Sequence, residues 1–185
     1  MQRVVQLVGI IITLQALVAC GVASRLSTPP QEIKSADSAI VYGYVEADND
    51  IIEQVDFVEY GKVYVSPFKF PPRVLVFDNG MFMAENIKPG TYVIASFRSE
   101  HNFYNLTRSQ RQFYQRIFRI EPGEVQYLGS FNLHITKKGR IDFGDFKVTE
   151  IQRPGERDVL KHLFHVTEGT AWQNKIARRL KELSQ

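Results

Sequence analysis

The sequence predicts a mainly β protein: an antiparallel β-sandwich of about 7–9 strands, followed by a pair of C-terminal helices. Between residues 39 and 151 the apolar runs are short, and turn residues rather than helical patterns separate them. Apolar and polar residues alternate with a period of two from Val125 to Thr136, which indicates a strand with one solvated face. After residue 156 the apolar spacing becomes helical.

The strands follow from these runs in chain order. We expect them at Ala39–Val45, Ile51–Val58, Lys62–Val65, Arg73–Phe77, Met81–Ala84, Tyr92–Phe97, Phe113–Ile120, Val125–Thr136 and Ile141–Ile151. Asn79-Gly80 is a strong hairpin signal. Pro89-Gly90 and Pro122-Gly123 predict two similar turns, because proline presets φ and glycine accepts a positive φ. We therefore expect a positive φ at Gly90.

Two helices are expected at the C-terminal end. Glu156–His165 places an apolar stripe on one face, and Gly169 ends that segment. Thr170 then reads as an N-cap, with Gln173 completing a capping box. The second stripe consists of Trp172, Ile176, Leu180 and Leu183. Such a stripe favours packing on the sandwich over a free docking groove.

The first twenty residues have the tripartite form of a secretory signal peptide: a basic start, an apolar run and small residues. The apolar run is shorter than the roughly 20 residues that a membrane-spanning helix needs. Cys20 is the only cysteine, and an odd cysteine in an exported protein requires an explanation. It ends Leu17-Val18-Ala19-Cys20, which resembles the lipobox of bacterial lipoproteins. The alternative is that Cys20 is a small residue tolerated near an ordinary cleavage site.

The lipobox resemblance implies that Cys20 is lipidated and becomes the new amino terminus. Gly21 after it then implies the outer membrane, with the protein facing the periplasm. Residues 20–37 contain Pro29-Pro30 and no sustained apolar period, which predicts a flexible tether. The expected organisation is a signal peptide (1–19), a lipidated cysteine and tether (20–37), a sandwich domain (38–151) and a helical segment (152–185).

A second resemblance lies in Asp78–Phe97, "DNGMFMAENIKPGTYVIASF". This stretch resembles the signature of carboxypeptidase-regulatory-like domains, which have a transthyretin-like (prealbumin-like) sandwich. The matching positions are Gly80, Phe82, Asn86, Ile87, Pro89, Gly90 and Tyr92. The usual glycine-rich turn near the front is replaced here by Asp48-Asn49-Asp50. The resemblance implies a fold and leaves the function open, because sandwiches carry unrelated activities.

Standard catalytic motifs are absent from the sequence: there is no nucleophile elbow, zinc-protease motif, phosphate loop or dinucleotide fingerprint. His162 and His165, with Glu168, have a spacing that could share a metal, but histidines on a helix face are the favoured interpretation. We expect no catalytic residue, cofactor or metal. The formal charge is +3 and no run of five basic residues occurs, so nucleic acid is not an expected partner.

The long connection Arg98–Gln112, "RSEHNFYNLTRSQRQ", is the candidate partner-binding segment. Aromatic and arginine side chains are the usual anchors of interfaces, and they occur here as Phe103, Tyr104, Arg108 and Arg111. The alternative is a mobile connection whose Phe103 caps the core.

Together these features predict a lipid-anchored cell-envelope protein acting as a non-catalytic binding or adaptor module. Its expected partners are the membrane, through Cys20, and another envelope protein. Two other functions stay open at this point. One is an accessory or regulatory subunit of an envelope secretion or peptidase assembly, and the other is a small wall or glycan hydrolase.

Overall fold

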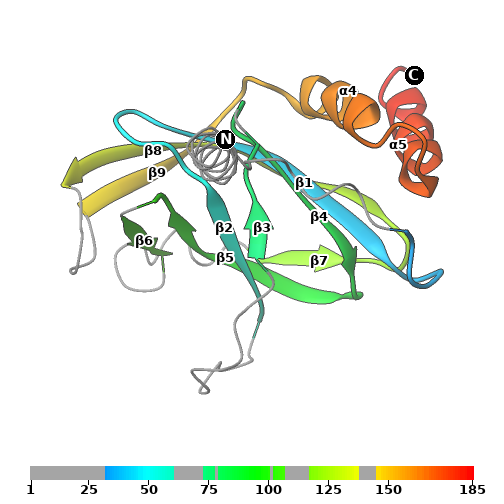
Figure 1. Ribbon diagram of the computed structural model, residues 1–185, viewed down its shortest axis with the longest axis horizontal. Helices are drawn as coiled ribbons and strands as arrows, with labels where there is room; N and C mark the ends of the chain where they lie inside the picture. Colours follow the sequence, from blue (N-terminus) through cyan, green and yellow to red (C-terminus); the bar gives the residue numbers. More distant parts are fainter. Residues whose placement is uncertain (1–31, 61–72, 78, 101, 107–116, 138–144) are drawn as a thin grey trace, which may run out of the picture.

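The computed structural model describes residues 32–60, 73–77, 79–100, 102–106, 117–137 and 145–185. The lipobox, the predicted strand Lys62–Val65, Arg108 and Arg111 lie outside the described residues. The strands are β1 (Ala39–Ala47), β2 (Gln54–Glu59), β3 (Arg73–Leu75), β4 (Met81–Ile87), β5 (Gly90–Arg98), β6 (Phe103–Asn105), β7 (Phe118–Ile120), β8 (Val125–Lys137) and β9 (Asp145–Ile151). The helices are α4 (Glu156–Val166) and α5 (Ala171–Glu182). The predicted fold class is confirmed (Figure 1).

Two sheets form the sandwich. Sheet A has four strands in the order β4-β1-β8-β9, and sheet B has five, with β3-β2-β5-β6 in order and β7 also paired to β5. One pair departs from the expected antiparallel arrangement, because β1 and β8 run parallel from Ile40↔Val125 to Ala47↔Leu133. An alternating pattern buries the same face in either direction, so the sequence could not reveal this pairing.

The main core lies between the sheets. In β8, Phe131, Leu133 and Ile135 are buried whereas His134 and Thr136 are exposed, which confirms the predicted alternation in this half of the strand. Around Gly129 the alternation is interrupted: Leu128 lies in the main core, whereas Tyr127 packs against the cluster under the helices. Sheet B contributes Phe57 of β2 and side chains of β5 such as Phe97, which lies 6.5 Å from Phe131 between ring centroids. Full burial of each such large apolar side chain stabilises the fold by about 1.5–3 kcal/mol.

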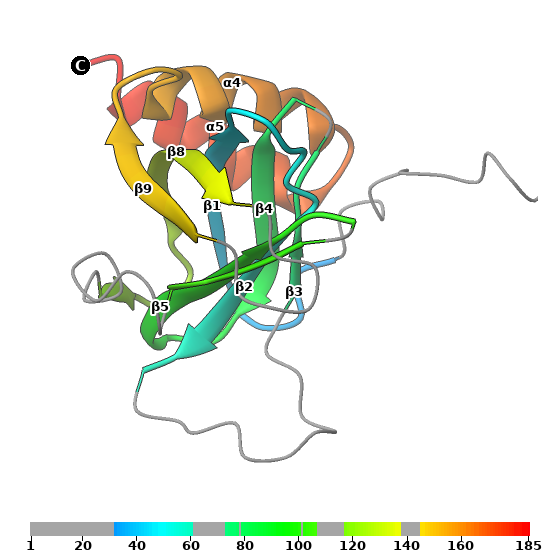
Figure 2. The same cartoon turned by 90° about the vertical axis from the view of Figure 1, so that its left-hand side faces the viewer.

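A second apolar cluster joins the helices to the outer face of sheet A (Figure 2). Trp172 and Ile176 of α5 and Leu163 of α4 are fully buried there, in the same cluster as Ile40 and Tyr42 of β1. The expected packing of the helical stripe on the sandwich is therefore confirmed. Beyond Tyr42 on this face, Tyr44 packs at the edge of the cluster and Glu46 follows near the end of β1.

The predicted capping box of α5 is wrong, although Thr170 is the N-cap. The Thr170 hydroxyl donates backward to the carbonyl oxygen of Thr167 at 2.7 Å. Gln173 accepts from the backbone N–H of Gly169 at 3.3 Å. The tight turn between the helices offers the threonine hydroxyl a nearer acceptor than the helix N–H groups, and short polar side chains readily use such local partners.

The turn before β5 also differs from expectation. Gly80 and Gly123 have φ values of 82° and 70°, but Gly90 has no positive φ and opens β5 opposite Ile120. The positive φ nearest this turn belongs instead to Asn86, in β4, with φ 56°. Asparagine tolerates this conformation better than most residues.

Asn86 has a specific task at this position. Its side-chain oxygen accepts from the backbone N–H of Lys34 at 2.8 Å, and its side-chain nitrogen donates to the carbonyl of Glu32 at 3.1 Å. Ile33 packs against the apolar cluster under the helices. Residues 32–37 of the predicted tether therefore lie against the sandwich, and the chain enters at the β4–β5 end.

Candidate binding site

The turn Asp48-Asn49-Asp50 lies at the opposite end of β1 from this entry point, where β1 turns into β2 (Figure 1). Its two carboxylates bind different sheets. We call Asp48 and Asp50, with their hydrogen-bond partners, the aspartate clasp.

Asp50 is tied to sheet B. Its Oδ2 accepts from the Tyr104 hydroxyl at 2.5 Å, from Ser99 Oγ at 2.9 Å and from Asn102 Nδ2 at 2.8 Å, while the backbone N–H of Ile51 donates to Oδ1 at 3.0 Å. Partial burial acts to raise the pKa of Asp50, but these hydrogen bonds outweigh it and hold the pKa below its usual value. Asp50 is therefore a carboxylate at neutral pH.

Asp48 is tied to sheet A. Its Oδ2 contacts His134 Nδ1, and its Oδ1 accepts from Asn132 Nδ2 at 3.2 Å. These two contacts, that of His134 first, lower the pKa of Asp48. Asn132 also donates to Glu46 at 3.1 Å, and Glu46 accepts from the Tyr44 hydroxyl at 2.9 Å. Tyr44, Glu46 and Asn132 therefore form a hydrogen-bonded row of side chains on sheet A. This row holds Asp48 of the clasp through Asn132.

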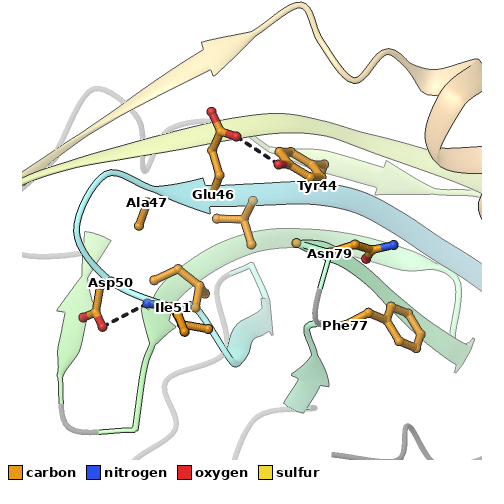
Figure 3. A pocket seen from close by; sticks show the side chains of 10 residues that line it. Tyr44, Glu46, Ala47, Asp50, Ile51, Phe77 and Asn79 are labelled. Carbon is orange, nitrogen blue, oxygen red and sulfur yellow. Dashed lines mark hydrogen bonds between the residues drawn. The ribbon is translucent and has the colours of Figure 1, made fainter.

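A pocket of about 250 Å³ opens beside the clasp (Figure 3). It is lined by Tyr44, Val45, Glu46, Ala47, Asp50, Ile51, Ile52, Phe77, Asn79 and Gly80. Ala47 points from β1 toward Ile51, whereas Glu46 projects from the other face of β1 (Figure 3). Val45 and Ile52 are buried core residues, but Ile51 is 62% exposed. Ile51 is thus an apolar side chain held at the surface by a hydrogen-bonded turn.

The pocket exists because β1 is longer than its neighbour β4. The β1–β4 register ends at Tyr44↔Met81, and the backbone N–H of Val45 donates to the Gly80 carbonyl at 2.8 Å. β1 continues to Ala47, where its described strand partner is β8. The β3–β4 turn closes one side of the pocket and is joined to α4, since Asn79 Nδ2 lies 3.1 Å from His162 Nε2.

The described part of the predicted binding segment lies at this same end. Phe103 and Tyr104 belong to β6 rather than to a loop, because they pair with Arg98 and Phe97 of β5. Tyr104 is fully buried, with its ring edge against Phe146 at 5.3 Å, so it anchors the clasp and is not presented to a partner. Phe103 is half-buried beneath the Arg98 guanidinium, 4.6 Å from the ring centroid. The expected binding role of Phe103, Arg108 and Arg111 stays a prediction.

Sequence reasoning missed Ile51 as a surface residue, because the run Ile51–Val58 reads as one strand. In the structure β2 begins only at Gln54, and the residues before it belong to the clasp. The available signal was the Asp48-Asn49-Asp50 cluster, since aspartate and asparagine side chains favour turns over strands.

A second pocket, of about 320 Å³, lies between the start of β8 and the helices. Glu156 accepts there from the Tyr42 hydroxyl and from Arg179, each at 2.9 Å. Burial, followed by the charge of Glu156, raises the pKa of Tyr42. At the rim, Arg119 pairs with Glu121 at 2.7 Å. The Tyr42–Glu156 hydrogen bond thus links α4 to β1, and the Glu156–Arg179 ion pair links α4 to α5.

In the described residues no three histidine, cysteine or acidic side chains are grouped so that they could hold a metal ion, and no helix there is long and apolar enough to cross a bilayer.

Comparisons with known proteins give little further information. The sequence matches no family model and no curated protein. Among solved structures, the chain is similar to the crystal structure of a DUF3823 family protein from Parabacteroides merdae, with 15% identity and a TM-score of 0.30. The match covers 63% of this chain and 60% of the length of that protein.

Proposed function

We propose that this chain is a lipid-anchored protein of the bacterial cell envelope whose sandwich is a non-catalytic binding or adaptor module. Lipid on Cys20 supplies the anchor after residues 1–19 are removed, and the outer membrane, facing the periplasm, is the proposed location. The lipobox supports the anchor. The resemblance of Asp78–Phe97 to carboxypeptidase-regulatory-like domains, together with the two-sheet fold, supports a prealbumin-like module.

The observation that carries this proposal is the separation of the two ends of β1. The chain from Cys20 reaches the sandwich at residues 32–37, beside Asn86, whereas the clasp and its exposed Ile51 lie where β1 ends. In this arrangement the tether holds the sandwich at the end where residues 32–37 enter, and the hydrogen-bonded clasp forms a rigid surface at the other end. Such a module suits the capture of a partner away from the membrane. Preorganisation of this kind lowers the entropic cost of association.

The partner in this proposal is another envelope protein, and its binding surface is the clasp end. Ile51 and Phe103 both flank the clasp, and the chain continues from β6 toward Arg108 and Arg111. Phe103, Arg108 and Arg111 are the proposed anchors of the interface, because aromatic and arginine side chains dominate other protein–protein contacts.

Photo-crosslinking in cells tests the proposal. A photoreactive amino acid replaces Ile51 or Phe103 in the full-length lipidated chain, and a matched control replaces the exposed Lys88 at the entry end. We expect a discrete crosslinked envelope protein from Ile51 or Phe103 and none from Lys88. Equal capture from all three positions, or none, would contradict the binding-module proposal, as would turnover of wall or glycan material by the purified protein.

A further inference from the structure

The pocket beside the clasp is a site for a side chain rather than for a cofactor. Its volume of about 250 Å³ is below the range of about 300–1,000 Å³ that is typical of small-molecule sites. Its apolar lining comes from Val45, Ala47, Ile51, Ile52 and Phe77, and Ile51 leaves 62% of its surface in solvent. A single apolar side chain inserted beside Ile51 would remove from water both the apolar lining of the pocket and the exposed surface of Ile51.

The charged residues that line this pocket, in the described part of the chain, all carry the same sign. The segment Glu46–Glu53, "EADNDIIE", carries four carboxylates and no lysine or arginine, and none of the ten residues that line the pocket is basic. Arg98, at the end of β5, is already paired with the buried Asp56 at 2.7 Å. Glu46 and Asp50 are the charged residues among those that line the pocket, and both are acidic, so the pocket favours a partner with basic side chains near the inserted apolar one.

A second copy of this chain does not fit that description. A two-fold contact brings the same patch of both subunits together, so it would place Glu46 and Asp50 of one subunit against those of the other. The clasp also fixes the pocket in advance, since Asp48 is bound to sheet A and Asp50 to sheet B. The pocket therefore keeps its shape on binding, and the partner segment changes its conformation to fit it.

We infer that the pocket beside the aspartate clasp receives an apolar side chain of a partner protein, from a segment in which lysine or arginine flanks that side chain. The inference rests on the proposed function and adds the chemistry of the partner to it. The apolar side chain packs against Ile51 and Ala47, and the flanking cations face the carboxylates of Glu46 and Asp50.

The first test identifies the captured segment. Mass spectrometry locates the crosslink from position 51 of the full-length chain in cells, and the expected site is an apolar residue within a lysine- or arginine-bearing stretch. A crosslink to a neutral or acidic stretch, or only to a second copy of this chain, overturns the inference. Failure at position 51 with capture from Phe103 overturns the inference alone, whereas failure at both positions removes the proposed function as well.

The second test uses defined probes with the purified full-length protein in detergent. One synthetic peptide has a central leucine flanked by lysines, and its control has glutamates in place of the lysines. Fluorescence anisotropy should show binding of the lysine peptide that weakens with salt, and at least tenfold weaker binding of the control. Equal binding of both peptides, or of neither, overturns the inference.

Two variants separate the apolar from the charged contribution. Ile51→Ser should weaken binding of the lysine peptide about tenfold with little loss of its salt dependence. Glu46→Gln removes the charge and should reduce the salt dependence; its amide oxygen still accepts from Asn132, and its amide N–H donates to the Tyr44 hydroxyl in place of accepting from it. Lys88→Gln, exposed at the entry end of the sandwich, is the matched control and should leave binding unchanged. If Ile51→Ser binds like the wild type, the pocket is not the site.

Discussion

Tyr104→Phe tests whether the aspartate clasp stabilises the fold as the structure implies. The ring is fully buried, and its hydroxyl donates to Asp50 at 2.5 Å. Phenylalanine fills the same volume, so the substitution removes a hydrogen bond and creates no cavity. A hydrogen bond to a charged group contributes about 1.5–3 kcal/mol, and we expect a loss near the lower bound because Ser99 and Asn102 still donate to Asp50.

The measurement is urea unfolding at pH 7, followed by circular dichroism and by the fluorescence of the single tryptophan, Trp172, which is buried between helix and sheet. For a chain of this length a loss of about 1.5–2 kcal/mol lowers Tm by roughly 3–8 °C. Asp50→Asn alone and combined with Tyr104→Phe complete a double-mutant cycle. We expect strong non-additivity, because both changes remove the same contact.

The pH dependence of the free energy of unfolding provides a further test of the contact between Tyr104 and Asp50. The pKa of Asp50 is lower in the folded protein than its usual value, so its contribution to stability is present above its unfolded pKa of about 4. That contribution is lost as the pH falls through the folded-state pKa. The stability difference between wild type and Tyr104→Phe should therefore be full at pH 7 and should narrow below about pH 4. A difference under about 0.5 kcal/mol at pH 7, within the range of ordinary surface changes, would refute the reasoning.

Three further predictions concern other parts of the chain. Cys20→Ala should remove the protein from the membrane fraction or leave an unprocessed form, as cell fractionation with a size shift would show; unchanged membrane retention and size would exclude the lipid. Trp172→Ala should cost about 3–5 kcal/mol in urea unfolding, because the side chain is fully buried against sheet A, and a loss under about 1 kcal/mol would show that the helices do not stabilise the sandwich. Gly80→Ala should destabilise by about 1–3 kcal/mol, since φ is +82° and a Cβ would lie 2.6 Å from the Val45 carbonyl, whereas Gly90→Ala should cost clearly less because φ there is not positive; equal melting temperatures for the two variants would contradict this.

Local patterns were enough to predict most of the secondary structure. The alternation in β8 and the helical stripe through Trp172 each report a buried face directly, because burial follows the period of the backbone. The turns at Gly80 and Gly123 were also correct, since their chemistry depends on adjacent residues. The turn at Gly80 does not join a regular hairpin, because β3 and β4 belong to different sheets and share one isolated bridge, Val76↔Phe82.

The features that could not be predicted depend on residues distant in sequence. The positive φ predicted at Gly90 was wrong, since Gly90 pairs with Ile120 at the start of β5. The positive φ occurs at Asn86, whose side chain binds backbone more than fifty residues earlier. The sequence predicts that Tyr104 lies in a loop and anchors a partner, yet in the structure it lies in β6 and its hydroxyl donates to Asp50. The candidate site was missed for the same reason. Ile51 follows Asp50, which is held by Ser99, Asn102 and Tyr104, about fifty residues later in the chain.

The position of β1 has a mechanical consequence. It is an inner strand of sheet A, with β4 on one side and β8 on the other. With Cys20 in the membrane and a partner bound at Ile51, tension enters near Ala39 and leaves near Ala47, about 26 Å away along the strand. Such a pull is directed along the strand, so the hydrogen bonds to both neighbours carry the load together in shear. They would not open one at a time, as they do when a hairpin is peeled from its end. In the proposed arrangement, the strand between the lipid anchor and the binding site is thus also the one best placed to resist extraction.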